Sequence, residues 1–193
     1  MEEINHVVRE AKKYAISEIE KFGFPTLINF EITEKKGLKL AKKFKVDKNI
    51  VLLGVYLMDL KLGQAIKENK LSEHIKMGVG ATKEFLDKYK IDDSIKEKVI
   101  NCIEAHHKDI QFKCIEAEIC ANADCYRFIH PKGFFSNLTA LGNRGFSFND
   151  ALGQAEKKLD EKYNILSLEV CKKELNKYYK NFKKYIEKAR KGL

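Results

Sequence analysis

The sequence predicts an all-α protein, an orthogonal bundle of several helices that forms a single domain over residues 1–193. Charged residues make up 34% of the chain and there are only two prolines, so helix-breaking positions are rare. Apolar residues recur every three or four positions along most of the chain, which is the spacing of one face of an α-helix. The phase of this pattern shifts between segments. This favours separate helices that cross one another, rather than a coiled coil.

In the first part of the chain the pattern predicts three helices. Apolar positions between 4 and 19 define the first, and the second runs from a cap at Thr33 to Phe44. Asp47 is expected to cap the third, over residues 49–62, whose apolar side chains point in every direction. A helix that is apolar all round belongs in the centre of the molecule.

The rest of the chain predicts further helices over residues 72–89, 92–107, 113–129, 147–162 and 168–191. The glycine-containing segment 133–145 is expected to link a core of about residues 26–130 to the C-terminal helices of about residues 147–191, which pack on it. The last helix carries an apolar stripe that packing on its own domain explains most simply. The alternative that the same stripe forms a homodimer interface stays open.

The formal net charge of +9 makes an anionic partner possible, including a nucleic acid. Between residues 156 and 193 the chain holds twelve Lys or Arg residues against six Asp or Glu residues. No stripe alternates basic with aromatic residues, and an ordinary solvated surface explains the lysines without any partner.

We expect a cytoplasmic protein without a membrane partner. No apolar stretch approaches the roughly 20 residues that cross a bilayer. The N-terminal residues 1–6 are acidic and then amphipathic, unlike a secretory signal. The five cysteines are therefore interpreted as reduced thiols, and their spacing is not that of a structural zinc site.

Asp59 and Asp124 are carboxylates in strongly apolar surroundings. Asp59 shares a helical face with Leu52, Val55 and Tyr56, and Asp124 lies among small apolar residues of the 113–129 helix. An isolated buried charge is very costly, so each carboxylate is expected to be hydrogen-bonded, paired or bound to a metal. Taken alone, a hydrogen-bonded Asp near a helix end explains Asp59 as well as a functional role does.

Three histidines complete a candidate ligand set. His106 and His107 end a helix, where the helix dipole favours them without any function, and His74 lies in the first turn of another helix. Together with Asp59 and Asp124 they offer imidazole and carboxylate ligands from consecutive helices. Such ligands suit a divalent ion of iron, manganese, zinc or nickel in the cavity of a helical bundle.

These motifs resemble the HD superfamily of metal-dependent phosphohydrolases, over about residues 29–184. That family has an apolar helix that ends in His-Asp, then a His before a helix of small residues, a His-His pair, and an Asp in another helix of small residues. Here the corresponding segments are 55–59, 73–81, 103–107 and 116–124. The resemblance implies an HD-like helical fold and a divalent metal bound by Asp59, His74, His106, His107 and Asp124.

The sequence departs from the family pattern at one of the two implied metal positions. Met58 replaces the His of His-Asp, Asn29 falls where the earlier family His is expected, and Leu62 takes the place of a nearby Lys. The first metal would be held by Asn29, Met58, Asp59 and Asp124, of which the first two are poor ligands. The second metal keeps all its residues, so the predicted loss is one-sided.

The resemblance implies a phosphohydrolase that acts on a phosphate ester, a phosphorylated small molecule or a nucleotide. With one ion bound, Lys61 would stabilise charge on the phosphate and Asp124 would orient or deprotonate the water. The alternative is a catalytically degenerate module that binds a nucleotide, a nucleic acid or a protein partner, since a fold does not establish an activity.

Overall fold

The computed structural model describes residues 2–107 and 110–191, and these residues form helices and no strands. The predicted all-α class is confirmed. In order along the chain the helices are α1 (Glu2–Phe22), α2 (Leu27–Phe44), α3 (Lys48–Leu57), α4 (Leu62–Lys67), the short 3₁₀ helix η1 (Leu71–Glu73), α5 (His74–Leu86), α6 (Asp93–Glu104), α7 (Ile115–Ile129), α8 (Pro131–Asn143), α9 (Phe148–Ile165) and α10 (Glu169–Lys191).

The N-cap of the second helix lies seven residues earlier than the sequence predicted. Its N-cap is Thr26, whose side-chain oxygen accepts a hydrogen bond from the Asn29 N–H at 3.2 Å. Thr33, the predicted cap, lies buried inside the helix and donates to the Asn29 carbonyl at 3.0 Å. A Thr hydroxyl can bond the backbone either at a cap or one turn back inside a helix, so residue type alone did not fix the boundary.

The central helix is α3, and it is shorter than predicted. Asp47 caps it as expected, accepting from the Asn49 N–H at 2.8 Å, but the helix ends at Leu57 and α4 starts at Leu62. A Cβ at Gly54 would lie 2.6 Å from Cys102 Cβ on α6 and 2.7 Å from Cys120 Sγ on α7. Only glycine allows α6 and α7 to cross α3 this closely, which brings the ends of these helices to one place.

The predicted glycine-containing linker over residues 133–145 is wrong, because most of it is the helix α8. Pro131 stands in the first turn of α8, where its missing N–H costs nothing. Gly133 permits close packing, since a Cβ there would lie 2.4 Å from the Arg127 carbonyl oxygen on α7. Gly133, which allows close packing of two helices, was therefore mistaken for a loop residue.

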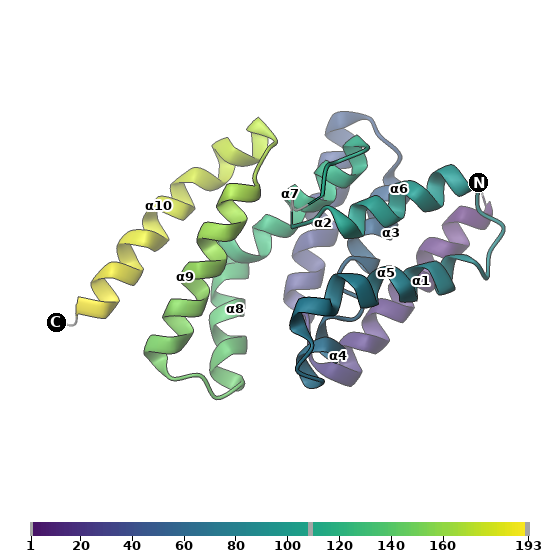
Figure 1. Ribbon diagram of the computed structural model, residues 1–193. Coiled ribbons are helices and arrows are strands. Elements are labelled where there is room, and N and C mark those ends of the chain that lie inside the picture. Colours follow the sequence, from purple (N-terminus) through teal and green to yellow (C-terminus); the bar gives the residue numbers. More distant parts are fainter. Residues whose placement is uncertain (1, 108–109, 192–193) are drawn as a thin grey trace.

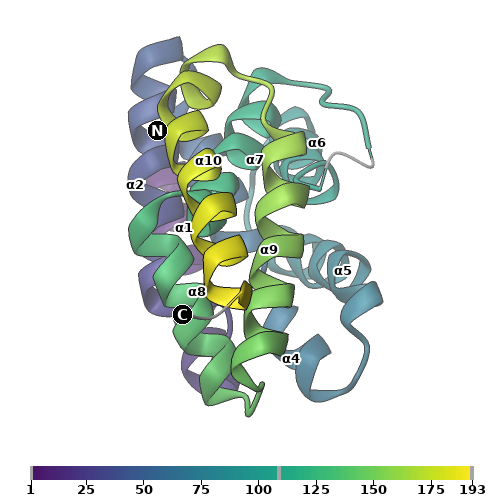
Figure 2. The same ribbon diagram turned by 90° about the vertical axis from the view of Figure 1, so that its left-hand side faces the viewer.

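The helices cross at large angles around α3 and α7 (Figure 1). One hydrophobic core runs from Val7 on α1 to Ile186 on α10. In the view of Figure 2, α2 and α8 lie on the left, α9 runs down the middle, and α5 and α4 lie on the right. Helices α8, α9 and α10 pack against α7 or its neighbours, so the C-terminal helices share the core of the rest of the chain.

The segment Lys48–Lys67 is long and apolar enough to be a candidate membrane span by length and composition, so the expectation that no stretch approaches this length was wrong. The fold buries 61% of the apolar window, and the helix is interrupted between Leu57 and Leu62. A buried core helix passes the same test, so this candidate is weak evidence for a membrane.

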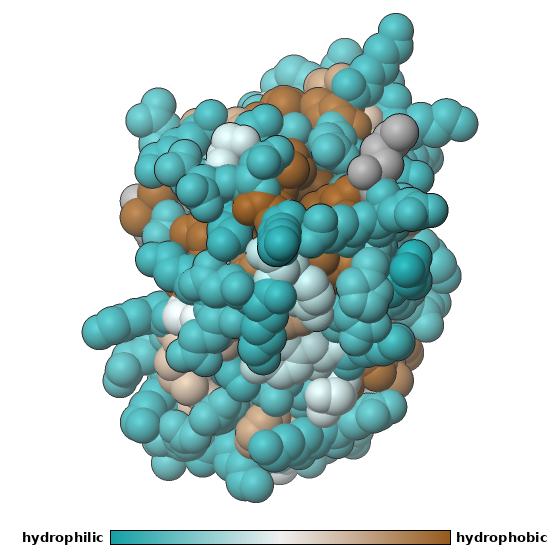
Figure 3. All heavy atoms as spheres, turned by 90° about the vertical axis from the view of Figure 1, so that its right-hand side faces the viewer, coloured by the Kyte–Doolittle hydropathy of each residue, from teal (hydrophilic) through white to brown (hydrophobic). Residues whose placement is uncertain are grey.

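Figure 3 shows the face of the molecule on the side of α1 and the start of α6. Hydrophilic side chains cover most of this face, and hydrophobic atoms form separate patches between them. Isolated apolar side chains on a surface are normal and require no partner to explain them.

Candidate metal centre

The ends of three helices bring four of the predicted site residues together. Asp59 lies in the turn after α3, His74 is the first residue of α5, and His106 and His107 follow the end of α6. Asp124 lies in the middle of α7, beside this group. The sequence placed Asp59 on the face of the central helix, whereas the structure places it just beyond the end of that helix, in a turn closed by the Leu62 N–H and the Asp59 carbonyl at 3.0 Å.

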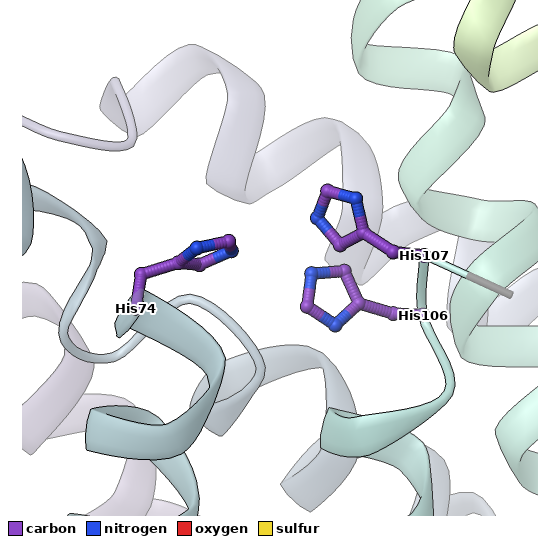
Figure 4. A group of neighbouring side chains, drawn as sticks. All are labelled: His74, His106 and His107. Carbon is purple, nitrogen blue, oxygen red and sulfur yellow. The ribbon is translucent and has the colours of Figure 1, made fainter. Parts of the chain in front are cut away.

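The three histidines form a compact cluster that we call the histidine triad. One ring nitrogen of each of His74, His106 and His107 lies within 4.8 Å of the others. Figure 4 shows the His74 ring pointing from α5 toward the other two rings, which come from the segment after α6. Bonds of about 2.0–2.1 Å place tetrahedral nitrogen ligands roughly 3.3 Å apart, so the three rings would have to draw slightly closer together to hold one zinc-like ion.

The His74 and His106 rings are each held by a hydrogen bond at their own Nδ1 atom. His74 Nδ1 lies 2.7 Å from the Leu71 carbonyl oxygen, and His106 Nδ1 lies 2.6 Å from the Ile103 carbonyl oxygen. A carbonyl only accepts, so each Nδ1 carries the proton and each Nε2 keeps its lone pair. The Nε2 of His106 is buried without a hydrogen-bond partner among the described residues, which is unusual for a native polar atom.

His107 is held by a carboxylate. Its Nδ1 lies 3.1 Å from Glu161 Oε1 on α9, and Lys158 Nζ lies 2.8 Å from the same carboxylate. A carboxylate behind an imidazole orients the ring and makes its other nitrogen a stronger metal ligand. Burial alone raises the pKa of Glu161, but the hydrogen bond from His107 and the charge of Lys158 bring it down to about 2, so this carboxylate is ionised.

Burial also keeps two members of the triad neutral. It lowers the pKa of His106 to about 3 and lowers the pKa of His74, although the negative charge of Asp59 opposes both shifts. A metal ligand must be the neutral imidazole, so neither ring has to lose a proton near neutral pH before it binds an ion.

Asp59 lies between the histidine triad and a cluster of charged side chains. Its Oδ1 is 3.8 Å from His106 Nε2, while its Oδ2 accepts a hydrogen bond from Arg127 Nη1. The same Arg127 nitrogen donates to Asp124 Oδ1 at 2.7 Å, and Lys162 Nζ on α9 lies 2.8 Å from Asp124 Oδ2. All four charged side chains are at least nine-tenths buried. We call these four residues the buried ion cluster.

The two cations keep both carboxylates of the buried ion cluster ionised. Burial alone raises the pKa of Asp59, but Arg127 and His106 bring it down to about 2. Burial also raises the pKa of Asp124, and Lys162 and Arg127 outweigh it, so this pKa lies well below its usual range. A carboxylate held by two buried cations is a poor base, which weakens the predicted role of Asp124 in deprotonating water.

The two residues that weaken the predicted first metal position are both buried. Met58 is 1% exposed and belongs to the hydrophobic core, and Asn29 is 4% exposed in the first turn of α2. Met58 also lines a small cavity together with Asp59 and Arg127. The expected fit of a metal at this position is poor, because a guanidinium already contacts the carboxylates that would hold it.

Lys61 points toward α1. Its Nζ lies 2.8 Å from Glu18 Oε2 and 5.5 Å from the centre of the Tyr14 ring. Both partners belong to α1, so the printed contacts of Lys61 tie the end of the central segment to the first helix. The predicted role of Lys61 in stabilising a phosphate stays a prediction.

Sequence reasoning missed three residues of this centre: Arg127, Lys162 and Glu161. Arg127 follows Asp124 by three residues and therefore shares its helical face, which was a usable signal. Lys162 and Glu161 lie on α9, in a lysine-rich part of the chain where nothing distinguishes a buried lysine from an exposed one. Lys162 is 1% exposed, which only the packing of α9 on α7 decides.

Comparisons with known proteins agree with this fold. No family model matches the chain. The crystal structure of a predicted HD superfamily hydrolase from an uncultured Thermotogales bacterium superposes with a TM-score of 0.54, at 18% identity, over 83% of this chain and 85% of that one. The chain therefore has the fold of the HD superfamily, and the resemblance that its motifs indicated is confirmed.

A curated relative is similar over part of its length. Ribonuclease Y from Finegoldia magna is 33% identical over 103 residues, which are 53% of this chain. The same residues are 18% of the relative, so the chain spans less than a fifth of the protein that it matches. These similarities show the fold of this chain, and they do not extend to an activity.

Proposed function

We propose that this chain is a metal-dependent phosphohydrolase that uses one divalent ion, bound by His74, His106 and His107 with Asp59 beside them. The arrangement of the histidine triad supports this proposal. Each Nδ1 is held by an oxygen atom, and each ring has its Nε2 left for an ion. Orienting hydrogen bonds of this kind accompany nearly every histidine that binds a metal.

The chemistry proposed for the centre is hydrolysis of a phosphate ester. A divalent ion bound there would lower the pKa of a water molecule and polarise a phosphoryl oxygen. Asp59 Oδ1, 3.8 Å from His106 Nε2, lies where a carboxylate could bind the ion or orient the water. Iron, manganese, zinc and nickel all accept this ligand set, so the metal's identity is part of the test.

One ion is proposed, because the buried ion cluster already balances its own charge. Asp59 and Asp124 carry two negative charges, and Arg127 and Lys162 carry two positive ones. A second divalent ion between the carboxylates would have to displace a buried guanidinium. One ion at the neutral triad leaves the centre with two excess positive charges, which favours a dianionic phosphate ester over a neutral substrate.

The proposed substrates are a phosphorylated small molecule, a nucleotide or an RNA phosphodiester. The last is included because the similar curated protein is named as a ribonuclease. The net charge of +9 would favour an anionic polymer as well as a small phosphate ester.

A second candidate function is a binding module that has kept the fold and lost the reaction. The observation that favours it is the pairing of Arg127 with both Asp59 and Asp124, the carboxylates that the family resemblance assigns to a first metal. In this reading the triad holds a structural ion or none, and a nucleotide, a nucleic acid or a protein is bound without turnover.

The test is a metal analysis of the purified full chain followed by a phosphatase and phosphodiesterase assay. We expect one equivalent of metal per chain and turnover of p-nitrophenyl phosphate, bis-p-nitrophenyl phosphate or an RNA oligonucleotide with manganese or iron added. His74→Ala should remove the metal and the turnover together. His6→Ala is the matched control, because His6 is exposed on α1 and lies outside the triad.

The outcomes separate the two functions. One metal per chain without turnover of any phosphate ester would favour the binding module. Turnover that survives in His74→Ala and in chelator would contradict the proposed metal centre.

A further inference from the structure

A groove on the surface between α2, α7, α8 and α10 gathers basic side chains away from the histidine triad. It is a cavity of about 240 Å³ lined by four lysines, together with a tyrosine and a histidine. We call it the lysine groove, and the six residues are Lys35, Lys36, Lys39, Lys132, Tyr126 and His130. Neither the family resemblance nor the proposed metal centre uses any of them.

The lysine groove and the metal centre lie on opposite sides of α7. Tyr126 follows Asp124 by two residues, so the two side chains project about 200° apart around the helix. In Figure 2, α2 and α8 of the groove lie on the left, whereas α5, which carries His74, lies on the right. A ligand in the groove would therefore not reach the triad.

Glutamates balance only part of the positive charge in the groove. Lys36 is 8% exposed, and its Nζ lies 2.6 Å from Glu174 Oε2, which also accepts from the Tyr126 hydroxyl at 2.9 Å. Lys35 forms an exposed pair with Glu31 at 3.4 Å. These contacts fix the floor of the groove and use both glutamates that line it.

Lys39 and Lys132 carry the remaining charge, because neither forms an ion pair with any residue in the ranges 2–107 and 110–191. Both side chains belong to exposed residues, so they are free to close on a ligand. His130 adds no charge near neutral pH, since burial and the charges of Lys36 and Lys132 lower its pKa. The groove thus has two uncompensated positive charges on opposite helices.

The start of α8 adds to this field. The first bond within α8 runs from the Phe134 N–H to the His130 carbonyl at 2.9 Å, so the N–H groups of residues 132 and 133 have no acceptor within the helix. Unpaired N–H groups at a helix start carry partial positive charge and favour an anion. Here they accompany a cavity and two exposed lysines without ion pairs among the described residues, and this combination suits a phosphate group.

We propose that the lysine groove is a second ligand site, which binds a small molecule with a diphosphate group. Two unpaired lysines on α2 and α8 match the charges of two adjacent phosphates. The cavity of about 240 Å³ lies just below the roughly 300–1,000 Å³ range of drug-sized sites, so it suits a small ligand. Ile32 and the Tyr126 ring add an apolar wall for whatever group the diphosphate carries.

The test is isothermal titration of the full chain with pyrophosphate and with ADP, in the presence of a chelator so that no metal contributes. We expect both anions to bind at one site per chain, more weakly as salt is raised. Tighter binding of ADP would identify a nucleotide as the source of the diphosphate, and equal binding would identify free pyrophosphate.

The variant is Lys39→Ala/Lys132→Ala, and the control is Lys43→Ala/Lys157→Ala, which removes the same charge at exposed positions outside the groove. The first pair should weaken binding about tenfold or more, and the control less than about twofold. All four residues are exposed, so circular dichroism and the thermal midpoint should not change. Wild-type protein that binds neither anion, or equal weakening by both pairs, overturns the proposal.

Discussion

On one side of the Asp59 carboxylate lie three histidine rings, and on the other lie a second carboxylate and two buried cations. The histidine side holds a buried ring nitrogen, Nε2 of His106, that has no hydrogen-bond partner among the described residues. The Arg127 side has its carboxylate charges already matched by a guanidinium and an ammonium. Asp59 touches both sides with different oxygens.

One carboxylate can therefore border both a site that is open to a cation and a site that is closed to one. Burial without partners makes the histidine side favourable for an ion, because a lone pair in a low dielectric gains from any cation. On the Arg127 side an incoming ion would have to break buried ion pairs, which costs several kcal/mol. The contrast predicts a single ion and can be tested by altering either side.

The largest effect is expected from Arg127→Met. The substitution leaves Asp59 and Asp124 with Lys162 as their one buried cation, so we expect unfolding by urea to become easier by about 3–5 kcal/mol. Manganese should restore part of this stability by entering the carboxylate side, and the metal content should rise above that of the wild type. Arg9→Met, at an exposed position of α1, is the control. Unchanged stability and unchanged metal content would show that Arg127 does not exclude an ion from its side of Asp59.

A smaller effect is expected from Glu161→Gln on the histidine side. The amide can still accept a hydrogen bond from His107 Nδ1, but it lacks the charge that strengthens the other ring nitrogen. We expect about a 10-fold loss of metal affinity, measured by competition with a chelating dye. Glu156→Gln on the same helix removes an equal charge away from the triad and should leave the affinity unchanged. Equal losses in the two variants would show a general charge effect.

The metal-free chain should lose stability as the pH falls through the range in which His106 titrates when unfolded. The pKa of His106 is about 3 in the folded chain, so below the unfolded value of about 6.5 the unfolded state binds more protons. The contribution of this group is present above about pH 6.5 and falls by at most about 1.4 kcal/mol per pH unit as the pH drops toward 3.

Urea unfolding in chelator at a series of pH values measures this slope. His106→Asn keeps a donor for the Ile103 carbonyl and should flatten the slope, whereas His6→Asn on α1 should not. A slope that is the same in His106→Asn and wild type would mean that another group causes the acid sensitivity.

The smallest effect is expected from Lys61→Met. The ion pair with Glu18 is partly buried, so its loss should cost about 1 kcal/mol or less of stability and leave metal affinity unchanged. Turnover should fall less than about tenfold if Lys61 serves mainly to hold α1. A fall of a hundredfold or more at unchanged stability would restore the catalytic role that the sequence suggested.

Helix positions were predictable where the signal was local. The cap at Asp47, the apolar face of α1, and the end of α7 before Pro131 all follow from residue types within one or two turns. The errors at Thr33 and over residues 133–145 arose where one residue type has two uses. A threonine can cap a helix or lie inside it, and a glycine can make a loop or allow two helices to touch.

The candidate site was partly predictable for the same reason. His74, His106, His107 and Asp59 stood out as a set, because together they offer imidazole and carboxylate ligands from consecutive helices in an order that resembles the HD superfamily. The structure brings these four together, and whether they bind a metal stays a prediction. Glu161, which orients His107, is separated from it by 54 residues and has no local signal.

Periodicity and neighbours within a few residues were enough to predict most of the helices and the central place of α3, but not α8 or the break between α3 and α4. The tertiary structure alone decided that Arg127 meets Asp59 across 68 residues of sequence and that Lys162 is buried against Asp124. Ion pairs of this kind depend on how helices cross, and the crossing is set by packing at positions such as Gly54. A charge affects stability and ion binding strongly when the fold removes the water around it.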